Sequence, residues 1–316
     1  MTNLEHDISY TTDEIAQLLK VSKLTVYDII KKGEIRAYRV GRQMRVDAVD
    51  LTAYKERLKS GGESTPVPSN SMIQQVTAES ATDKQIIISG QDLSLDIIAS
   101  HIEESGLYRP LRSFSGSLNS LIKMYQGQAD IVSTHLFDGE TGEYNLPYIK
   151  RLLTGRSYMV INLLGRKAGL YVQKENPKQL QNWSDLGQSG IRIVNREKGS
   201  GARVLLDEQL LLAGITGASI DGYDDEELNH MAIATRIASG QADAGVGIEK
   251  TARLIDVDFI PLIQEQYDVV LMKTPENEKL RELIVETLNS PSFKEKLAAI
   301  GGYDLTKTGT ILYETV

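Results

Sequence analysis

Four short polar loops carry the residues whose chemistry is easiest to interpret. They are Ser89-Gly90-Gln91-Asp92, Phe114-Ser115-Gly116-Ser117, Ser133-Thr134-His135 and Lys198-Gly199-Ser200-Gly201, and each follows an apolar segment typical of a strand. Ligands of α/β proteins collect at the carboxyl ends of strands. A helix that begins there offers free N–H groups and its positive dipole end to an anion, and serine adds a hydroxyl donor. If these loops converge, they predict a cage for a tetrahedral oxyanion.

A second chemical signal is a basic stripe near the N-terminus. The segment Lys20–Arg45 holds eight basic and two acidic residues, a net charge of +6, although the whole chain has a net charge of −8. A local basic stripe on an acidic protein is typical of phosphate contacts. We therefore expect double-stranded DNA as a partner of this segment.

Other reactive residues favour binding over catalysis. His135 and His230, with Asp138 close to the first, are candidate metal ligands, but isolated histidines are more often structural, and we predict neither metal nor cofactor. No nucleophile, base and orienting group stand together, so we expect no enzyme. The enzymatic alternative is a transferase-like domain in molybdenum cofactor metabolism, with Asp138 and His135 as acid and base. Arg203 could instead pair with an organic carboxylate, so a small metabolite is the alternative ligand.

Length and composition set the frame for these sites. The 316 residues suggest two or three domains, and 41% hydrophobic with 25% charged residues is typical of a soluble globular protein. The chain has no cysteine, which excludes disulfides and thiolate sites. Met1–Tyr10 lacks the features of a secretory signal, and no apolar run reaches the ~20 residues of a membrane helix. We expect a cytoplasmic protein with no membrane partner.

Two different patterns of elements divide the chain. Apolar spacing predicts helices from Thr12, over 22–31 and over 48–58, with a hairpin over 36–46. Residues 60–83 are rich in Ser, Gly, Pro, Thr and Glu and are typical of a linker. From Lys84 onward strands and helices alternate, which indicates an α/β domain. The predicted strands are 85–89, 131–134, 157–164, 169–173 and 191–195, and the predicted helices are 93–104, 118–125 and 202–213.

A repeated four-residue motif, which we call the internal echo, indicates two related lobes in the α/β part. Gly127-Gln128-Ala129-Asp130 and Gly240-Gln241-Ala242-Asp243 each follow a predicted helix and precede an apolar strand. Such an identity can arise by chance or from a shared turn type. Its identical context favours two similar sub-folds.

The N-terminal residues also carry a family resemblance. Tyr10-Thr11-Thr12, Thr25-Val26-Tyr27, Val40-Gly41-Arg42 and Asp50-Leu51, with their spacing over residues 10–58, resemble the excisionase/MerR-type winged helix-turn-helix module. The resemblance implies a recognition helix in the major groove and a hairpin wing on the DNA backbone. A small helical protein–protein adaptor is the alternative. The residues that we expect to contact DNA are Ser22, Lys23, Thr25, Tyr27, Lys31, Arg39, Arg42 and Arg45.

The remaining chain, over about residues 84–316, resembles the substrate-binding-protein-like domain of bacterial regulators, which is related to periplasmic molybdate and tungstate binders. The resemblance rests on Gly116-Ser117, His135-Leu136, Gly199-Ser200-Gly201 and the two copies of the echo. It implies a bilobed, type II periplasmic-binding-protein fold with the ligand between the lobes. The motif usually has threonine after Gly201, and this chain has Ala202, so one hydroxyl donor is missing. The expected ligand-binding residues are Ser89, Gln91, Ser115, Gly116, Ser117, Thr134, His135, Asn195, Ser200, Gly201, Ala202, Arg203, Tyr223 and Gly245.

Together these signals predict an α/β protein with a winged helix-turn-helix domain (1–59), a linker (60–83) and a bilobed sensing domain (84–316). We interpret it as a one-component transcriptional regulator that senses a small oxyanion, with molybdate or tungstate as the first candidates. Closure of the lobes around the ligand would move the linker or a dimer contact, so a homodimer is expected.

Overall fold

The computed structural model describes residues 9–19, 21, 25–26, 29–30, 35, 37–40, 43–47, 50–52, 54 and 84–315. The chain divides into two units, Met1–Ala78 and Glu79–Val316, and each is described here by itself. The predicted linker 60–83 lies outside the described residues. Within the described parts, none of the helices combines the length and apolar character needed to cross a membrane.

The first unit is a small sheet with helical residues packed against it. Strand β1 (Ser9–Thr11) leads into α1 (Thr12–Leu19), and β2 (Tyr38–Val40) and β3 (Gln43–Asp47) form the predicted antiparallel hairpin. β1 pairs with the other edge of β3 and was not predicted, because three residues are too few to show alternation. The described residues of the second and third predicted helices are helical. The buried core residues are Ile15, Val26, Ile35, Val46, Leu51 and Tyr54.

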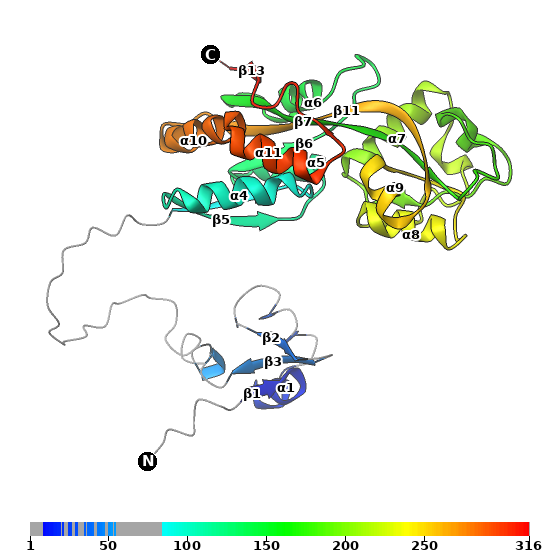
Figure 1. The fold of residues 1–316 in the computed structure, drawn as a ribbon. Coiled ribbons are helices and arrows are strands. Elements are labelled where there is room, and N and C mark those ends of the chain that lie inside the picture. Colours follow the sequence, from blue (N-terminus) through cyan, green and yellow to red (C-terminus); the bar gives the residue numbers. More distant parts are fainter. Residues whose placement is uncertain are drawn as a thin grey trace, which may run out of the picture. The chain divides into compact units, whose positions relative to one another are not determined.

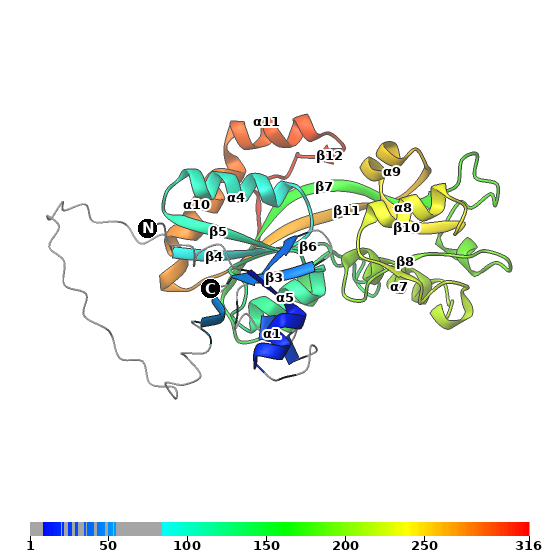
Figure 2. The ribbon, with the colours of Figure 1, turned by 90° about the horizontal axis from the view of Figure 1, so that it is seen from below.

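The second unit has two lobes that share one mixed sheet (Figures 1 and 2). We define the first lobe as residues 84–164 and 267–315. Its strands β4 (Lys84–Ser89) and β6 (Ile131–Thr134) run parallel because helices cross between them. Apolar runs such as Ile86–Ile88 fill the space between helical layers. Its elements are β4 (Lys84–Ser89), α4 (Ser94–Glu104), β5 (Tyr108–Ser113), α5 (Ser117–Tyr125), β6 (Ile131–Thr134), α6 (Leu146–Leu152), η3 (Pro275–Asn277), α10 (Glu278–Asn289), α11 (Pro291–Ile300), β12 (Tyr303–Asp304) and β13 (Ile311–Glu314).

The second lobe comprises residues 165–266. Part of its core lies between the sheet and α7 (Gly201–Leu212), and the other part lies between the sheet and the helices α8 (His230–Ala238) and α9 (Glu249–Ile255). The predicted strand over 191–195 was wrong in its bounds, because Arg192 and Ile193 make only isolated bridges to two different segments. The elements are η1 (Trp183–Gly187), β8 (Asn195–Arg196), α7 (Gly201–Leu212), η2 (Gly217–Ser219), β9 (Glu226–Glu227), α8 (His230–Ala238), β10 (Ala244–Ile248) and α9 (Glu249–Ile255).

Two long strands, which we call the hinge strands, join the lobes. β7 (Tyr158–Val172) and β11 (Asp258–Met272) pair antiparallel along their lengths and run from one lobe into the other (Figure 2). The prediction of two separate strands, 157–164 and 169–173, was wrong. Strand β7 continues through the polar residues between the two predicted strands because Arg166 lies directly opposite Glu265 on β11, and their ion pair compensates both charges. A Cβ on Gly169 would lie 1.9 Å from the carbonyl oxygen of Ile260, so only glycine fits there.

The internal echo corresponds to the same turn in both lobes. Gly127 and Gly240 end α5 and α8 with positive φ angles of 73° and 72°. The carboxylate of Asp130 accepts a hydrogen bond from the backbone N–H of Ile87 at 2.7 Å, and that of Asp243 accepts one from Arg192 at 2.8 Å. Each aspartate thus ties the start of its strand to the neighbouring segment, which supports two related sub-folds.

The lobes also touch away from the hinge strands. Phe137, in the connection between β6 and α6, packs in the core of the second lobe. Glu208 of α7 accepts hydrogen bonds from the backbone N–H of Gly139 at 3.1 Å and from the hydroxyl of Tyr148 at 2.8 Å. The lobes are therefore in contact on the α6–α7 side.

Candidate functional site

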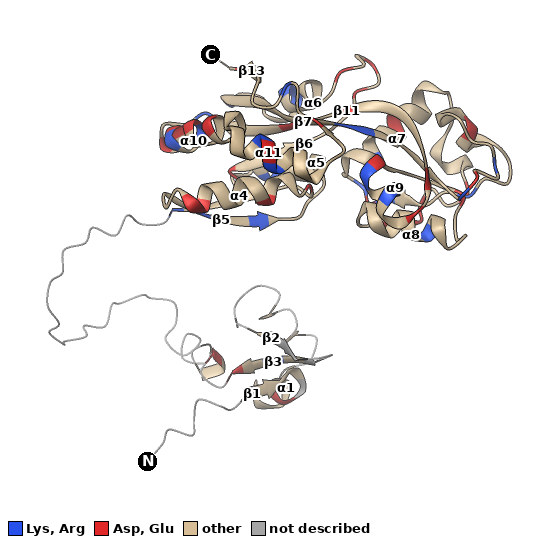
Figure 3. Ribbon diagram, in the orientation of Figure 1, with Lys and Arg blue, Asp and Glu red and all other residues tan. Residues whose placement is uncertain are grey.

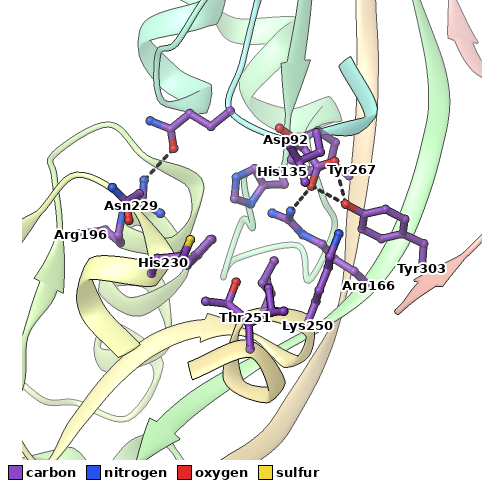
Figure 4. A pocket seen from close by; sticks show the side chains of 15 residues that line it. Asp92, His135, Arg166, Arg196, Asn229, His230, Lys250, Thr251, Tyr267 and Tyr303 are labelled. Carbon is purple, nitrogen blue, oxygen red and sulfur yellow. Dashed lines mark hydrogen bonds and ion pairs between the residues drawn. The ribbon is translucent and has the colours of Figure 1, made fainter. Parts of the chain in front are cut away.

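A pocket of about 320 Å³ lies between the two lobes (Figure 4). The first lobe contributes the loop after β4, His135 after β6, and Tyr303. The hinge strands contribute Arg166 and Tyr267, and the second lobe contributes β8 and the starts of α8 and α9. The lining residues are Gln91, Asp92, Leu93, His135, Arg166, Arg196, Asn229, His230, Met231, Ile248, Lys250, Thr251, Leu254, Tyr267 and Tyr303.

A buried ion network forms the hinge side of the pocket. Arg166 lies between two carboxylates, since its Nη1 is 2.7 Å from Asp92 and its Nε donates to Glu265. Glu265 also accepts a hydrogen bond from Nδ1 of His135 at 2.6 Å. The Arg166 guanidinium lies over the Tyr267 ring, 4.6 Å from its centre. Burial alone would raise the pKa of Glu265, but the charge of Arg166 and the hydrogen bonds from Arg166 and His135 lower it to about 2.

His135 has a defined protonation pattern in this network. Burial is the largest influence on the pKa of His135 and lowers it, against the opposing effect of Glu265. The ring is therefore neutral at pH 7. Since the Glu265 carboxylate can only accept, Nδ1 carries the proton and Nε2 is left as an acceptor. The ring stacks on Tyr267 at 5.0 Å between centres, which fixes its orientation.

The second lobe presents a buried arginine and a histidine to the same space. Arg196 donates to Glu197 at 2.8 Å and, across the lobes, to Oε1 of Gln91 at 2.7 Å. His230 is the first residue of α8, and burial, followed by the charge of Arg196, lowers its pKa well below the usual value. Its Nδ1 is shut off from solvent and has no hydrogen-bond partner among the described residues.

Of the sequence-predicted ligand residues, Gln91 and His135 line this pocket. The two Ser-Gly loops meet directly across the lobes instead. The N–H of Leu118 donates to the carbonyl oxygen of Gly199 at 3.0 Å, and a Cβ on Gly116 would lie 2.6 Å from that oxygen. Ser117 accepts from the N–H of His135, and Ser200 caps α7 by accepting from the N–H of Arg203.

The other predicted ligand residues have structural partners or are buried. The loop 133–135 does not precede a helix directly, since α6 begins only at Leu146. Arg203 is buried against acidic partners, with Asp207 at 3.1 Å and Glu226 at 3.1 Å. The hydroxyl of Thr134 is buried without a partner among the described residues. Four of the remaining residues form hydrogen bonds: Ser89 with Ser120, Ser115 as acceptor from Lys123, Asn195 as donor to the carbonyl of Tyr223, and Tyr223 as donor to Asp207. The other three are in packing contacts: Gly201 with His135, Gly245 with Ile233, and Ala202 in the core of the second lobe.

Asp138, the acid of the enzymatic alternative, caps a turn. Its carboxylate accepts from the N–H and the hydroxyl of Thr141, both at 2.9 Å. Burial acts to raise the pKa of Asp138, but these hydrogen bonds lower it overall. It does not line the pocket. Across the described parts of the chain, His, Asp and Glu side chains form no group of three suited to a metal ion.

Few predicted DNA contacts lie in described parts of the first unit. Thr25 is exposed on the second helix, and Arg45 lies on β3. Arg39 belongs to β2. Ser22, Lys23, Tyr27, Lys31 and Arg42 lie outside the described residues.

Sequence reasoning missed most of the pocket. Arg166 and Lys167 form a short basic stretch in the middle of β7, where the strand passes between the lobes (Figure 3). Glu265 likewise interrupts the apolar pattern of β11. A charge inside a buried strand needs a partner, so these interruptions are the signal that could have located the hinge side of the pocket. Nothing comparable distinguishes Lys250 or Thr251 in the sequence.

Known proteins share both units. Residues 99–289 match the family described as the PBP superfamily domain, and residues 9–59 match a helix-turn-helix domain. The uncharacterized protein YvgK of Bacillus subtilis is 54% identical over 308 residues, which cover 97% of this chain and 98% of YvgK.

Solved structures share the bilobed fold. The tungstate ABC transporter structure from Geobacter sulfurreducens has a TM-score of 0.51 at 12% identity and covers 68% of this chain and 98% of its own. A substrate-binding protein of Clostridium perfringens with bound phosphate has a TM-score of 0.50 at 13% identity and covers 70% and 99%. The prediction of a helix-turn-helix domain followed by a type II periplasmic-binding-protein fold is confirmed.

Proposed function

Because this chain belongs to the PBP superfamily domain family and carries an N-terminal helix-turn-helix domain, we propose that it is a ligand-responsive transcriptional regulator. The first unit binds double-stranded DNA, and the second binds a small anion between its lobes. Both domains are binding domains, so the function is recognition rather than catalysis.

One observation carries the proposal: the pocket takes its lining from both lobes and from the strands that join them. A ligand there contacts Gln91 and His135 on one side and Arg196 and His230 on the other. Such a ligand stabilises the closed arrangement of the lobes over any more open one. The free energy of closure is thereby available to change the affinity for DNA.

Anionic chemistry fits the side chains at this pocket. Arg166, Arg196 and Lys250 are cationic, and the N-terminus of α8 adds a positive dipole end. Molybdate and tungstate, which the sequence resemblance implies, are the first inorganic ions to titrate, together with phosphate and sulfate. A cage at the two Ser-Gly loops remains a prediction, and it requires another donor where the N–H of Leu118 already donates to Gly199.

The test is a measurement of DNA affinity with and without ligand. A duplex selected from a random library by the full-length protein is titrated by fluorescence anisotropy. We expect a bound anion to change the dissociation constant at least about fivefold, the lower end of typical coupling. The opposite result, an anion that binds by calorimetry and leaves DNA affinity unchanged, contradicts the proposal.

The predicted wing has its own test. Arg42→Ala and Arg45→Ala should weaken DNA binding and make the salt dependence shallower by about one logarithmic unit per lost phosphate contact. The matched control is Lys279→Met on α10 of the second unit. Parent-like binding of both variants at every salt concentration would show that the hairpin does not contact DNA. A homodimer remains a prediction, which sedimentation of the full-length protein on the selected duplex checks.

A further inference from the structure

We propose that the pocket between the lobes accepts an organic monoanion with an apolar body rather than a bare inorganic oxyanion. This inference rests on the proposed function and deepens it, because it names the ligand class of the same site.

The size of the pocket is the first argument. Its volume of about 320 Å³ corresponds to the space of about ten water molecules at ~30 Å³ each. Pockets for organic ligands begin at roughly 300 Å³. A single tetrahedral ion would leave most of this space unfilled.

The charge balance is the second argument. Arg166 is paired with Asp92 and Glu265, and Arg196 is paired with Glu197. Lys250 lines the pocket, 5.3 Å from the centre of the Tyr303 ring, and no carboxylate in the described part of the chain pairs with it. Because Arg166 has two carboxylate partners, these groups and Lys250 together carry no net charge, and Lys250 is the cation of the lining whose ammonium lacks a carboxylate of its own among the described residues. A carboxylate on the ligand can supply that partner.

The outer lining is the third argument. Leu93 from the first lobe and Met231 and Leu254 from the second lobe line the pocket, yet their exposed fractions are 56%, 54% and 67%. We call these three residues the rim. Large apolar side chains left exposed beside a pocket are typical of a surface that an apolar group covers. A ligand with its anionic group at Lys250 and its apolar body on the rim satisfies both features.

Figure 4 shows how the polar part is arranged for such a ligand. Lys250 and Thr251 come from the start of α9, and His230 and Asn229 come from the start of α8. The polar contacts and the apolar rim therefore belong to one pocket.

The experiment is calorimetric titration of the full-length protein with acetate, butyrate, hexanoate, hexanamide and molybdate. From acetate to hexanoate we expect each added methylene to tighten binding about fourfold, the effect of burying a methylene group. Hexanamide should bind at least tenfold more weakly than hexanoate, because it has the same body without the charge.

Variants separate the two parts of the ligand. Lys250→Met should abolish the preference for hexanoate over hexanamide, and Lys279→Met is the matched charge control. Met231→Ser and Leu254→Ser should flatten the dependence on chain length and keep the preference for the carboxylate. Leu212→Ser, at an exposed leucine of α7 outside the pocket, is the matched apolar control. Thermal unfolding of each variant verifies that it folds.

Three outcomes would overturn the inference: no heat with any carboxylate at millimolar concentration, an affinity independent of chain length, or tighter binding of molybdate than of hexanoate. If molybdate or tungstate then changes DNA affinity, the regulator proposal survives and only the ligand class is wrong. If no anion of either kind changes DNA affinity, the regulator proposal itself fails.

Discussion

Glu265 is the residue on which the hinge side of the pocket depends. Its carboxylate holds Arg166 and orients His135, and all three groups are buried. Removing one member of a buried ionic group leaves the others uncompensated, which typically costs about 3–5 kcal/mol. The residue therefore links the folding of β7 and β11 to the protonation pattern of the pocket.

The free energy of unfolding at acid pH should therefore depend on the ionisation of Glu265. The pKa of Glu265 is about 2 in the folded protein and near its ordinary value of 4.5 in the unfolded chain. The stabilisation is therefore present above pH 4.5 and is lost as the pH falls toward 2, about 3 kcal/mol in total. In urea titrations, the difference in unfolding free energy between the parent and Glu265→Gln should shrink below pH 4.5. If this difference in unfolding free energy is the same at pH 7 and at pH 3.5, the assigned role of Glu265 is wrong.

Anion binding should be coupled to proton uptake at His135. In the free protein the ring is neutral and offers Nε2 as an acceptor, so an anion near Nε2 favours the imidazolium and raises the His135 pKa in the complex. Glu265, Arg166, Arg196 and His230 also act on this ring. Anion affinity should rise as the pH falls from 8 to 6.

The coupling is measurable by calorimetry in buffers of different ionisation enthalpy. The observed enthalpy should depend on the buffer for the parent and not for His135→Gln. A buffer-independent enthalpy for the parent below pH 7 would show that His135 does not take up a proton on binding.

At the scale of elements, the two lobes contain the same helix–turn–strand motif. The glycine adopts a positive φ, and the aspartate three residues later accepts a backbone hydrogen bond from the neighbouring segment. The sequence could predict this repeat because the turn is local. It could not predict that β7 continues through Arg166, because the partner that permits it, Glu265, is far away in the sequence.

The repeated turn gives a matched pair of variants. Gly127→Ala and Gly240→Ala should each destabilise the protein by roughly 1–2 kcal/mol, because the left-handed conformation is costly for residues with a Cβ. No atom lies near the added Cβ at Gly127, and the nearest at Gly240 is 4.0 Å away, so the backbone effect is isolated. Urea unfolding should give similar losses at both sites, and Gly→Asn variants should lose less. Unequal losses would indicate that the two turns differ in role.

At the scale of the whole molecule, order along the chain was easier to predict than the composition of the pocket. The alternation of strands and helices after Lys84 predicted the α/β class, and the family resemblance implied a site between two lobes. Gln91 and His135 were identified because they follow strands. Arg196 and Lys250 were not, because only the packing of distant segments brings them to the pocket.

The domain boundaries remain a prediction with a direct test. Limited proteolysis should cut first within 60–83, since this Ser-, Gly- and Pro-rich stretch is poor in large apolar residues. The product should begin near residue 84 and keep the affinity of the full-length protein for whichever anion binds. Mass spectrometry of the fragments identifies the cut, and first cleavage inside 90–300 would contradict an independent sensing unit.

The second lobe is an insertion into the first, and this has a consequence for synthesis on the ribosome. Ile131 of β6 pairs with Leu271 of β11, so the sheet of the first lobe stays incomplete until the whole second lobe has been translated. At about 5–20 residues per second, the roughly 100 inserted residues take roughly 5–20 s. During that time the nascent chain already contains the entire helix-turn-helix segment. A chain truncated within the second lobe would therefore retain the DNA-binding segment and lack the strand that closes the sensor.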